Sequence, residues 1–382
     1  TGVVNGYKPI ENYVSLLLRE IEILGKKLES KFNISHIHFG GGTPSILKGA
    51  ELWLIMQSIK RRFNVLKDCK IAMEIDPRFF KQNLTIILND CGFNRISIGV
   101  QDFSQNVQTL INRKQSFEIT EETVKHLREN NISNINIDLI YGLPKQTVQT
   151  FADTLEKIRT LKPDRISAFG YAHVPWMKKH QRLIKVRPLD NEERLKFYRL
   201  ASHYFLSNGY EPFGIDHYAE KSSSIIQNVK NRKLQRNFQG YTEDDADVLI
   251  GIGASSISSL PNGYVQNIAK ITDYMRSLKK NKLPISRGYE LKTKDKIYSN
   301  VIKELMCYLN VDLRQVTKKF SKDINLFSSN IKKLKPFIDA DYVNFQNFVL
   351  SIKPEARPLV RIICSVFDQY FEPKANRYSF GI

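Results

Sequence analysis

Hydrophobic residues in the first 170 positions form short runs separated by longer amphipathic stretches. The runs are rich in β-branched residues, as in parallel strands covered on one or both faces, and they predict strands at 34–39, 70–75, 95–100, 134–141 and 165–171. The amphipathic stretches predict helices at 51–63, 79–89 and 147–160. Because strands alternate with helices of this length, the pattern predicts a parallel α/β sheet or barrel.

The pattern changes towards the C-terminus. A long helix is predicted from Pro188 to about Ser207, followed by a mixed segment that includes the glycine-rich stretch 251–254. From about residue 293 the pattern is mostly helical, and it ends with an alternating stretch at 342–352 and a helix at 357–370. We therefore predict two domains, an α/β barrel with its extension at 1–290 and a mostly helical domain with a winged β element at 291–382.

Polar residues and glycines stand at or near the ends of the five predicted strands. In chain order these are Gly41-Gly42-Thr43, Glu74 with Asp76, Gln101, Asp138, and Tyr171-Ala172-His173. Ligand sites in α/β folds lie at the C-terminal ends of the strands. The positions therefore predict one shared pocket, and they favour a partial or complete barrel over a doubly wound sheet.

The sequence His-Phe-Gly-Gly-Gly-Thr-Pro at 38–44 is the strongest local motif. Glycines let the backbone approach a ligand closely, and Pro44 suits the start of a helix. The motif is neither a dinucleotide fingerprint nor a Walker loop, because the required spacing and lysine are missing. A purely structural turn is the alternative interpretation.

Two further groups carry possible chemistry. Glu74 and Asp76 share a face at a strand end, and we expect Glu74 to hold an ammonium group while Asp76 caps a helix that begins at Pro77. His36 and His38 also share a strand face, but no third residue is spaced to complete a zinc site with them.

Composition narrows the functional classes. The chain has 58 Lys+Arg against 39 Asp+Glu and a net charge of +19, but the basic residues are scattered, which favours a solvated surface over a nucleic-acid stripe. Nucleic-acid binding through the basic cluster at 332–335 is a weaker alternative. Four separated cysteines exclude a CxxC motif and a disulfide scaffold, so we expect a cytoplasmic protein. No apolar run approaches the roughly 20 residues of a membrane span.

Several longer motifs resemble those of the radical S-adenosylmethionine (SAM) enzymes, and in particular the oxygen-independent coproporphyrinogen III oxidases. The resemblance covers nearly the whole chain. It rests on GGGTP at 40–44, EIDP at 74–77, GFNRISIGVQDF at 92–103, NIDLIYGLPKQT at 136–147, YAHVP at 171–175, RNFQGYT at 236–242 and RPLVRIICSVFD at 357–368. The resemblance implies a partial (β/α)6 barrel with a C-terminal helical domain. It also implies two SAM molecules beside a [4Fe-4S] cluster.

The resemblance also assigns residues. It places Gly41, Glu74 and Ile257 on the SAM that binds the cluster, with Glu74 towards its amino group. Six positions match those that hold the second SAM: Gly42, Thr43, Gln101, Arg113, Asp138 and Ala172. Phe238, Gln239 and Tyr241 lie in the motif specific to the oxidases, and we expect them near the active site. The catalytic residues are otherwise unknown.

The implied activity belongs to haem (porphyrin) biosynthesis. A deoxyadenosyl radical removes hydrogen from a substrate propionate, and loss of carbon dioxide and one electron leaves a vinyl group. Two propionates of coproporphyrinogen III react, giving protoporphyrinogen IX. The substrate carries four carboxylates, with which the positive charge is compatible. We expect a monomer with an external electron donor, no nucleic acid and no membrane span. The alternative is a non-catalytic haem-binding or haem-delivery relative.

One family motif is missing. The resemblance calls for CxxxCxxC thiolates to hold the cluster, and Cys69, Cys91, Cys307 and Cys364 match none of the expected positions. We therefore expect no metal ligand in this chain. A truncated chain, whose first barrel strand and cluster cysteines precede Thr1, is our preferred interpretation, and a pseudoenzyme is the alternative. In either case we expect the chain alone to be inactive.

Overall fold

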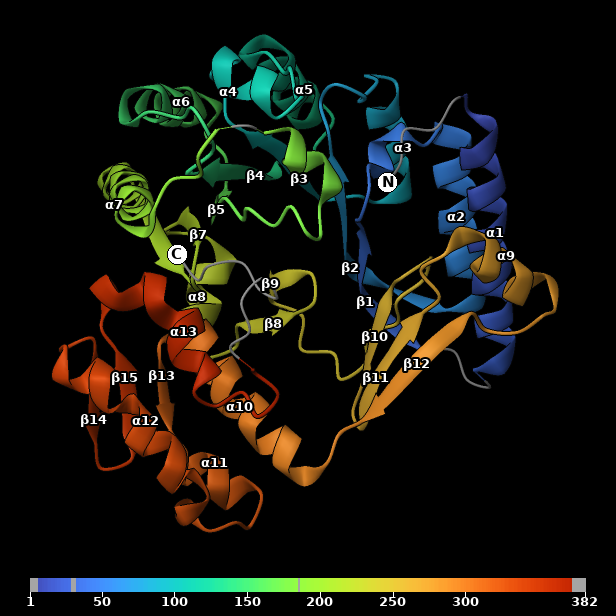
Figure 1. The fold of residues 1–382 in the computed structure, drawn as a ribbon. Helices are drawn as coiled ribbons and strands as arrows, with labels where there is room; N and C mark the ends of the chain where they lie inside the picture. Colours follow the sequence, from blue (N-terminus) through green and yellow to red (C-terminus); the bar gives the residue numbers. More distant parts are fainter. Residues whose placement is uncertain (1–5, 29–31, 185, 373–382) are drawn as a thin grey trace. The chain divides into compact units, whose positions relative to one another are not determined.

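The computed structural model describes residues 6–28, 32–184 and 186–372, and it divides into two compact units (Figure 1). The first unit comprises residues 1–99, 119–135 and 244–292, and the second comprises 100–118, 136–243 and 293–382. The predicted domains at 1–290 and 291–382 are a different division, and they stay a prediction.

The first unit contains parallel strands joined by helices. Its strands pair in the order β1, β2, β3. The elements are α1 (Lys8–Lys27), β1 (Asn33–Phe39), the 3-10 helix η1 (Pro44–Ile46), α2 (Gly49–Arg62), β2 (Asn64–Ile75), α3 (Leu84–Cys91) and β3 (Arg95–Gln101). The register of β1 on β2 shifts between Ile34 and His36, which explains why β2 is longer than the predicted strand at 70–75.

A small antiparallel sheet completes the first unit. Its strands pair in the order β10, β11, β12. The elements are β10 (Ile257–Leu260), β11 (Gly263–Asn267), α9 (Ile271–Lys279) and β12 (Ile285–Glu290). Helix α1 packs against α2 and α9 (Figure 1), and Ile23, Tyr274 and Leu278 form an apolar cluster between α1 and α9. The sequence pattern predicted neither α1 nor this sheet.

The second unit contains the remaining strands of the α/β sheet. β4 is parallel to β5, and β7 and then β6 follow in antiparallel order. The elements are α4 (Gln105–Leu110), α5 (Phe117–Glu129), β4 (Asn134–Tyr141), α6 (Val148–Leu161), β5 (Arg165–Gly170), η2 (Lys179–Leu183), α7 (Asn191–Ser207), β6 (Tyr210–Phe213), β7 (His217–Glu220), α8 (Ser224–Lys230), β8 (Gln235–Asn237) and β9 (Gly240–Thr242). The first residues of β4 and most of α5 belong to the first unit.

The C-terminal part of the second unit is mostly helical, as predicted. It has a three-stranded antiparallel sheet in the order β13, β15, β14. The elements are α10 (Thr293–Tyr308), β13 (Asn310–Asp312), α11 (Leu313–Lys319), η3 (Ile324–Phe327), α12 (Ser328–Asp339), β14 (Val343–Gln346), β15 (Val349–Ile352), η4 (Pro354–Leu359) and α13 (Val360–Ser365). Leu305, Leu350, Val360 and Phe367 are fully buried between these elements.

Two predicted helices were wrong in their bounds. The helix predicted at 79–89 begins only at Leu84, so Asp76 is not its cap. Asp76 instead accepts hydrogen bonds from the backbone and guanidinium of Arg78 in a turn. The helix predicted at 357–370 is replaced by η4 and the short α13, which ends at Ser365.

Candidate functional site

The glycine motif and Glu74 meet at the ends of β1 and β2 in the first unit. Glu74 Oε2 accepts the backbone N–H of Gly41 at 3.1 Å, and Glu74 Oε1 lies 3.2 Å from His38 Nε2. Burial opposes ionisation of Glu74, but the hydrogen bond and charge of His38, together with the Gly41 N–H, outweigh it and lower the pKa of the carboxyl. The carboxylate is therefore negative at neutral pH, and it still has lone pairs for a cation.

The backbone beside this carboxylate leaves no room for a side chain at position 40. A Cβ added to Gly40 would lie 2.5 Å from His38 Nε2 and 2.7 Å from Glu74 Oε1. Gly41 and Gly42 have φ values of +76° and +70°, and open space surrounds the missing Cβ of Gly41. The motif is thus an open backbone loop beside an oriented carboxylate, which is what close approach by a small cationic ligand requires.

Ile257 begins β10, and two residues separate it from the glycine-rich stretch at 251–254. That stretch is held by Glu20 of α1, whose carboxylate is 1% exposed and accepts hydrogen bonds from Gly253 N–H, Asn267 Nδ2 and Tyr274 Oη. Gly253 has φ +104°, and a Cβ there would lie 2.8 Å from the Tyr13 hydroxyl. A buried carboxylate on the first helix therefore fixes the backbone that leads to Ile257.

In the second unit, the buried side chain and the backbone of Gln108 hold the turn that follows Gln101 and the backbone of Arg113. Gln101 ends β3 with φ +70°, a left-handed conformation rarely adopted by a glutamine. The next residue, Asp102, is fully buried, and burial raises the pKa of its carboxyl. Gln108 connects this turn to Arg113. Its side-chain amide donates to the Asp102 backbone carbonyl at 2.8 Å, and its own backbone carbonyl accepts the Arg113 N–H at 2.8 Å.

Gln146 links the turns that follow β3 and β4. Its side-chain amide donates to the Asp102 carboxylate, and its oxygen accepts the N–H groups of Gly142 at 2.6 Å and Leu143 at 3.2 Å. Because the Gln146 side chain forms hydrogen bonds to both turns, it links the C-terminal ends of β3 and β4. Sequence reasoning assigned no role to Asp102 or Gln146, although both lie within the quoted motifs.

Asp138 lies in β4, and Ala172 follows the end of the neighbouring parallel strand β5 in the second unit. Asp138, within β4, accepts a hydrogen bond from Asn136 Nδ2 at 2.8 Å, and Asn136 in turn accepts one from Ser167 of β5. The Ala172 carbonyl accepts a hydrogen bond from Gln181 at 3.0 Å just beyond β5. Asp138 and the Ala172 carbonyl are thus each held by a neighbouring amide side chain.

The oxidase-specific motif forms the β8–β9 hairpin. Phe238 is 56% exposed in its turn, where Asn237 Oδ1 accepts the N–H of Gln239. Tyr241, by contrast, is buried, and its hydroxyl accepts the Ile215 N–H and donates to the Met306 carbonyl. Phe238 and Gln239 are therefore accessible to a ligand, whereas Tyr241 anchors the hairpin.

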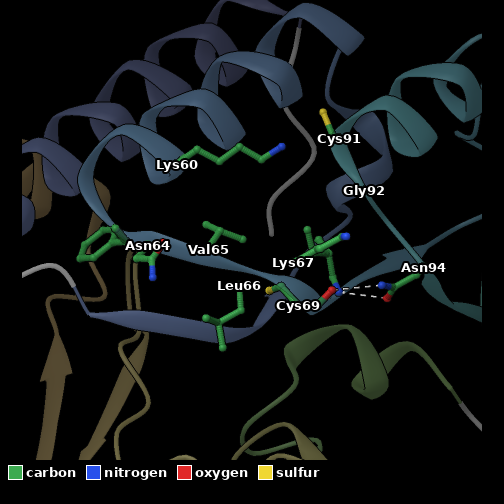
Figure 2. Close-up of a pocket in the computed structure, with 11 residues that line it drawn as sticks. Lys60, Asn64, Val65, Leu66, Lys67, Cys69, Cys91, Gly92 and Asn94 are labelled. Carbon is green, nitrogen blue, oxygen red and sulfur yellow. Dashed lines mark hydrogen bonds between the residues drawn. The ribbon is translucent and has the colours of Figure 1, made fainter.

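The four cysteines are buried as free thiols in this structure. Burial raises the pKa of Cys69 to about 11 and of Cys307 and Cys364 to about 12. A cavity of about 480 Å³ beside β2 is lined by Cys69 and Cys91 together with Lys60 and Asn94. Figure 2 shows Asn94 bonded across this cavity wall, where it donates to the Cys69 carbonyl at 3.1 Å. In the described part of the chain, no three His, Cys, Asp or Glu side chains are grouped to hold a metal ion.

Comparison with known proteins places these features in a family. The sequence profile of the radical SAM superfamily matches residues 4–158. An oxygen-independent coproporphyrinogen III oxidase from Cereibacter sphaeroides is 39% identical over 97% of this chain and 82% of its own length. The chain belongs to the oxygen-independent coproporphyrinogen III oxidases. A second relative, from Bradyrhizobium diazoefficiens, is 38% identical over all of this chain and 85% of its own length.

The fold agrees with this family. The solved coproporphyrinogen III oxidase of Escherichia coli, described as a radical SAM enzyme, has a TM-score of 0.93 and 33% identity. That match covers 97% of this chain and 86% of the solved chain. The predicted radical SAM α/β fold and the predicted enzyme class are confirmed. Across the described residues, no helix combines the length and apolar character needed to cross a membrane.

Proposed function

We propose that the chain provides the substrate and SAM sites for oxidative decarboxylation of coproporphyrinogen III to protoporphyrinogen IX. The observation that carries the proposal is the Glu74 carboxylate, which is kept ionised by His38 and is bonded to Gly41 in the glycine loop. The level of identity to named oxidases along nearly the entire chain supports the reaction class. SAM and a [4Fe-4S] cluster supply the radical chemistry of this family when bound.

The residues fit SAM. Its amino group is a cation, and Glu74 offers an ionised, partly exposed carboxylate beside backbone that lacks Cβ atoms. We assign the methionine end of one SAM to Glu74 and Gly41, with Ile257 as a further contact. The assignment of a second SAM to Gly42, Thr43, Gln101, Arg113, Asp138 and Ala172 is part of the same proposal.

The thiols of this chain do not fit the cluster. Cluster iron is held by several thiolates at once, whereas the four cysteines here are buried, no three of them are grouped in the described part of the chain, and burial raises the pKa of each of them. We therefore propose that the 382-residue chain alone is catalytically inactive. Anaerobic reconstitution with iron and sulfide, followed by a protoporphyrinogen assay with SAM and a reductant, should give no turnover. Robust turnover would refute this part of the proposal.

SAM binding tests the role of Glu74 directly. Glu74→Gln should weaken SAM binding by about 10-fold, because a charged hydrogen bond to the ammonium group is lost. Methylthioadenosine lacks that ammonium group, so its affinity should not change. Glu22→Gln, which alters a surface carboxylate paired with Arg62 in the same unit, is the control. Equal loss of both ligands in Glu74→Gln would show that the loop had collapsed and would contradict the assignment.

The haem-delivery alternative stays a hypothesis. Tight stoichiometric haem binding by this protein in a titration, without decarboxylation of coproporphyrinogen III, is the result that would favour it.

A further inference from the structure

A continuous arc of charged and aromatic side chains lies in the second unit around the turn between β6 and β7. Asp216, 8% exposed, is bonded to His217 Nδ1 at 2.8 Å and to Arg361 at 2.7 Å. The His217 ring packs edge-on against Tyr241 at 5.0 Å between centroids, and the Arg236 guanidinium lies over the Tyr241 ring at 5.6 Å. The arc therefore runs from Arg236 to Arg361, with one carboxylate in it.

Tyr241 gives Arg236 a rigid support. The two residues face each other across the β8–β9 hairpin. Tyr241 is fixed by two hydrogen bonds to backbone groups, and its ring fills the space beside Gly214, where an added Cβ would lie 2.1 Å from it. A guanidinium stacked on such a ring loses little further freedom when it binds a ligand.

The charges of the arc do not balance. Burial opposes ionisation of Asp216, but His217, Arg361 and Arg236 outweigh it and lower the pKa of the carboxyl. Asp216 is hydrogen-bonded by Arg361, whereas the exposed guanidinium of Arg236 has no carboxylate partner among the described residues. The single carboxylate of the arc is therefore set against two arginines, and the side chain of Arg361 is still 49% exposed.

We propose that Arg236 binds a propionate carboxylate of the porphyrinogen substrate, with Arg361, oriented by Asp216, as a second positive group at the other end of the arc. A guanidinium presents a planar pair of N–H donors that matches a carboxylate. This inference rests on the proposed function, which supplies a substrate with four carboxylates. It also gives the hairpin motif a role, because Arg236 directly precedes Asn237.

Binding of coproporphyrin III, the stable oxidised form of the substrate, tests the proposal. Titration followed by porphyrin fluorescence would use the full chain and its variants. Arg236→Gln should weaken binding by about 10-fold, and Arg236→Lys should restore part of the affinity, because charge is kept but the planar fork is lost. The neutral tetra-amide of coproporphyrin III should bind the wild type and Arg236→Gln equally.

Arg314 provides a matched control. Its guanidinium lies over the Phe348 ring at 4.6 Å, so it is also an arginine stacked on an aromatic ring, but it is outside the arc. Arg314→Gln should bind coproporphyrin III like the wild type. Equal losses in Arg314→Gln and Arg236→Gln would show an effect of overall charge and would overturn the proposal.

The remaining outcomes separate the inference from the proposed function. If the wild type binds coproporphyrin III and folded Arg236→Gln binds it equally well, the arginine assignment is wrong while the proposed function stands. If the wild type does not bind coproporphyrin III, both fail. Circular dichroism of each variant establishes that it is folded, and Arg236→Lys gives a second test at the same position.

Discussion

Glu20 should be a major determinant of stability in the first unit, and its replacement by glutamine is an informative perturbation. Its Oε2 accepts hydrogen bonds from Gly253 N–H and Tyr274 Oη, and its Oε1 accepts one from Asn267 at 2.6 Å. In Glu20→Gln the new amide oxygen can keep two of these bonds, but the amide nitrogen then faces the Asn267 nitrogen. Two N–H donors, the amide of the new glutamine and the amide of Asn267, then face each other in place of the hydrogen bond from Asn267 to Glu20.

The cost follows from the surroundings of Asn267. Its side-chain nitrogen also donates to the Gly253 carbonyl and Ser256 Oγ, both at 3.0 Å, so the amide cannot turn over without losing those bonds. A buried donor left unsatisfied costs about 1–3 kcal/mol. We expect Glu20→Gln to lower the free energy of unfolding by about 2 kcal/mol at neutral pH, and Glu20→Ala by about 3–5 kcal/mol, since it leaves three donors and a cavity.

The pH dependence has a definite sign. Burial raises the pKa of Glu20 in the folded chain, although its hydrogen bonds oppose the shift. The contribution of Glu20 to stability is therefore complete below its unfolded pKa of about 4.3, and it is lost as pH rises through the folded pKa. Glutamine does not titrate. The stability difference between wild type and Glu20→Gln should be largest at acid pH and should shrink as pH rises.

Urea denaturation at several pH values measures this difference, and hydrogen exchange of the peptide around Gly253 localises it. Glu11→Gln is the control, because Glu11 is on the same helix and, among the described residues, forms solvent-screened ion pairs with Lys8 and Lys48. Unchanged stability in Glu20→Gln, or a difference that widens with rising pH, would refute the reasoning. Unchanged exchange at Gly253 would show that the loop does not depend on the carboxylate.

Three other predictions concern the second unit and the thiols. Gly214→Ala should lower the free energy of unfolding by at least 3 kcal/mol in urea denaturation, because the new Cβ would overlap the Tyr241 ring and φ of Gly214 is +57°. A loss below about 1 kcal/mol would contradict this packing. Gln146→Leu should lower the free energy of unfolding by about 2–4 kcal/mol in the same measurement, since it leaves the Asp102 carboxylate and the backbone N–H groups of Gly142 and Leu143 without their partner. Unchanged stability would count against this hydrogen-bond network. All four thiols should react slowly with Ellman's reagent at pH 8 in the folded chain, because burial raises their pKa values, and rapidly in urea. A rapid reaction without urea would be inconsistent with their burial.

Local patterns predicted much of the α/β sheet. β4 has the predicted bounds, since eight alternating and β-branched residues between polar turns leave little choice. The sequence also predicted that Glu74 and Gly41 share one pocket, and the structure shows them hydrogen-bonded at the ends of adjacent parallel strands. The error at residues 79–83 arose because Asp76 and Pro77 suit a helix start, whereas the Arg78 side chain stabilises a turn there instead.

The roles of Glu20 and Gln146, which hold other residues in position, could not be predicted from local sequence patterns. Glu20 contacts residues 233 to 254 positions later in the chain, and Gln146 contacts Asp102 across 44 positions. Their partners are ordinary asparagines, tyrosines and backbone groups that carry no motif. A buried acid on an amphipathic helix is a usable signal, but only the fold identifies what it binds.

The discontinuous first unit has a consequence for the order of events during synthesis. Residues 244–292 supply its small sheet and α9, and they leave the ribosome long after α1. Until they arrive, Glu20 has no Gly253, Asn267 or Tyr274 to contact, and the apolar face of α1 that packs on α9 is uncovered. Translation at about 5–20 residues per second leaves this gap open for roughly 10–50 seconds. The nascent chain is therefore a natural client for chaperones in that interval.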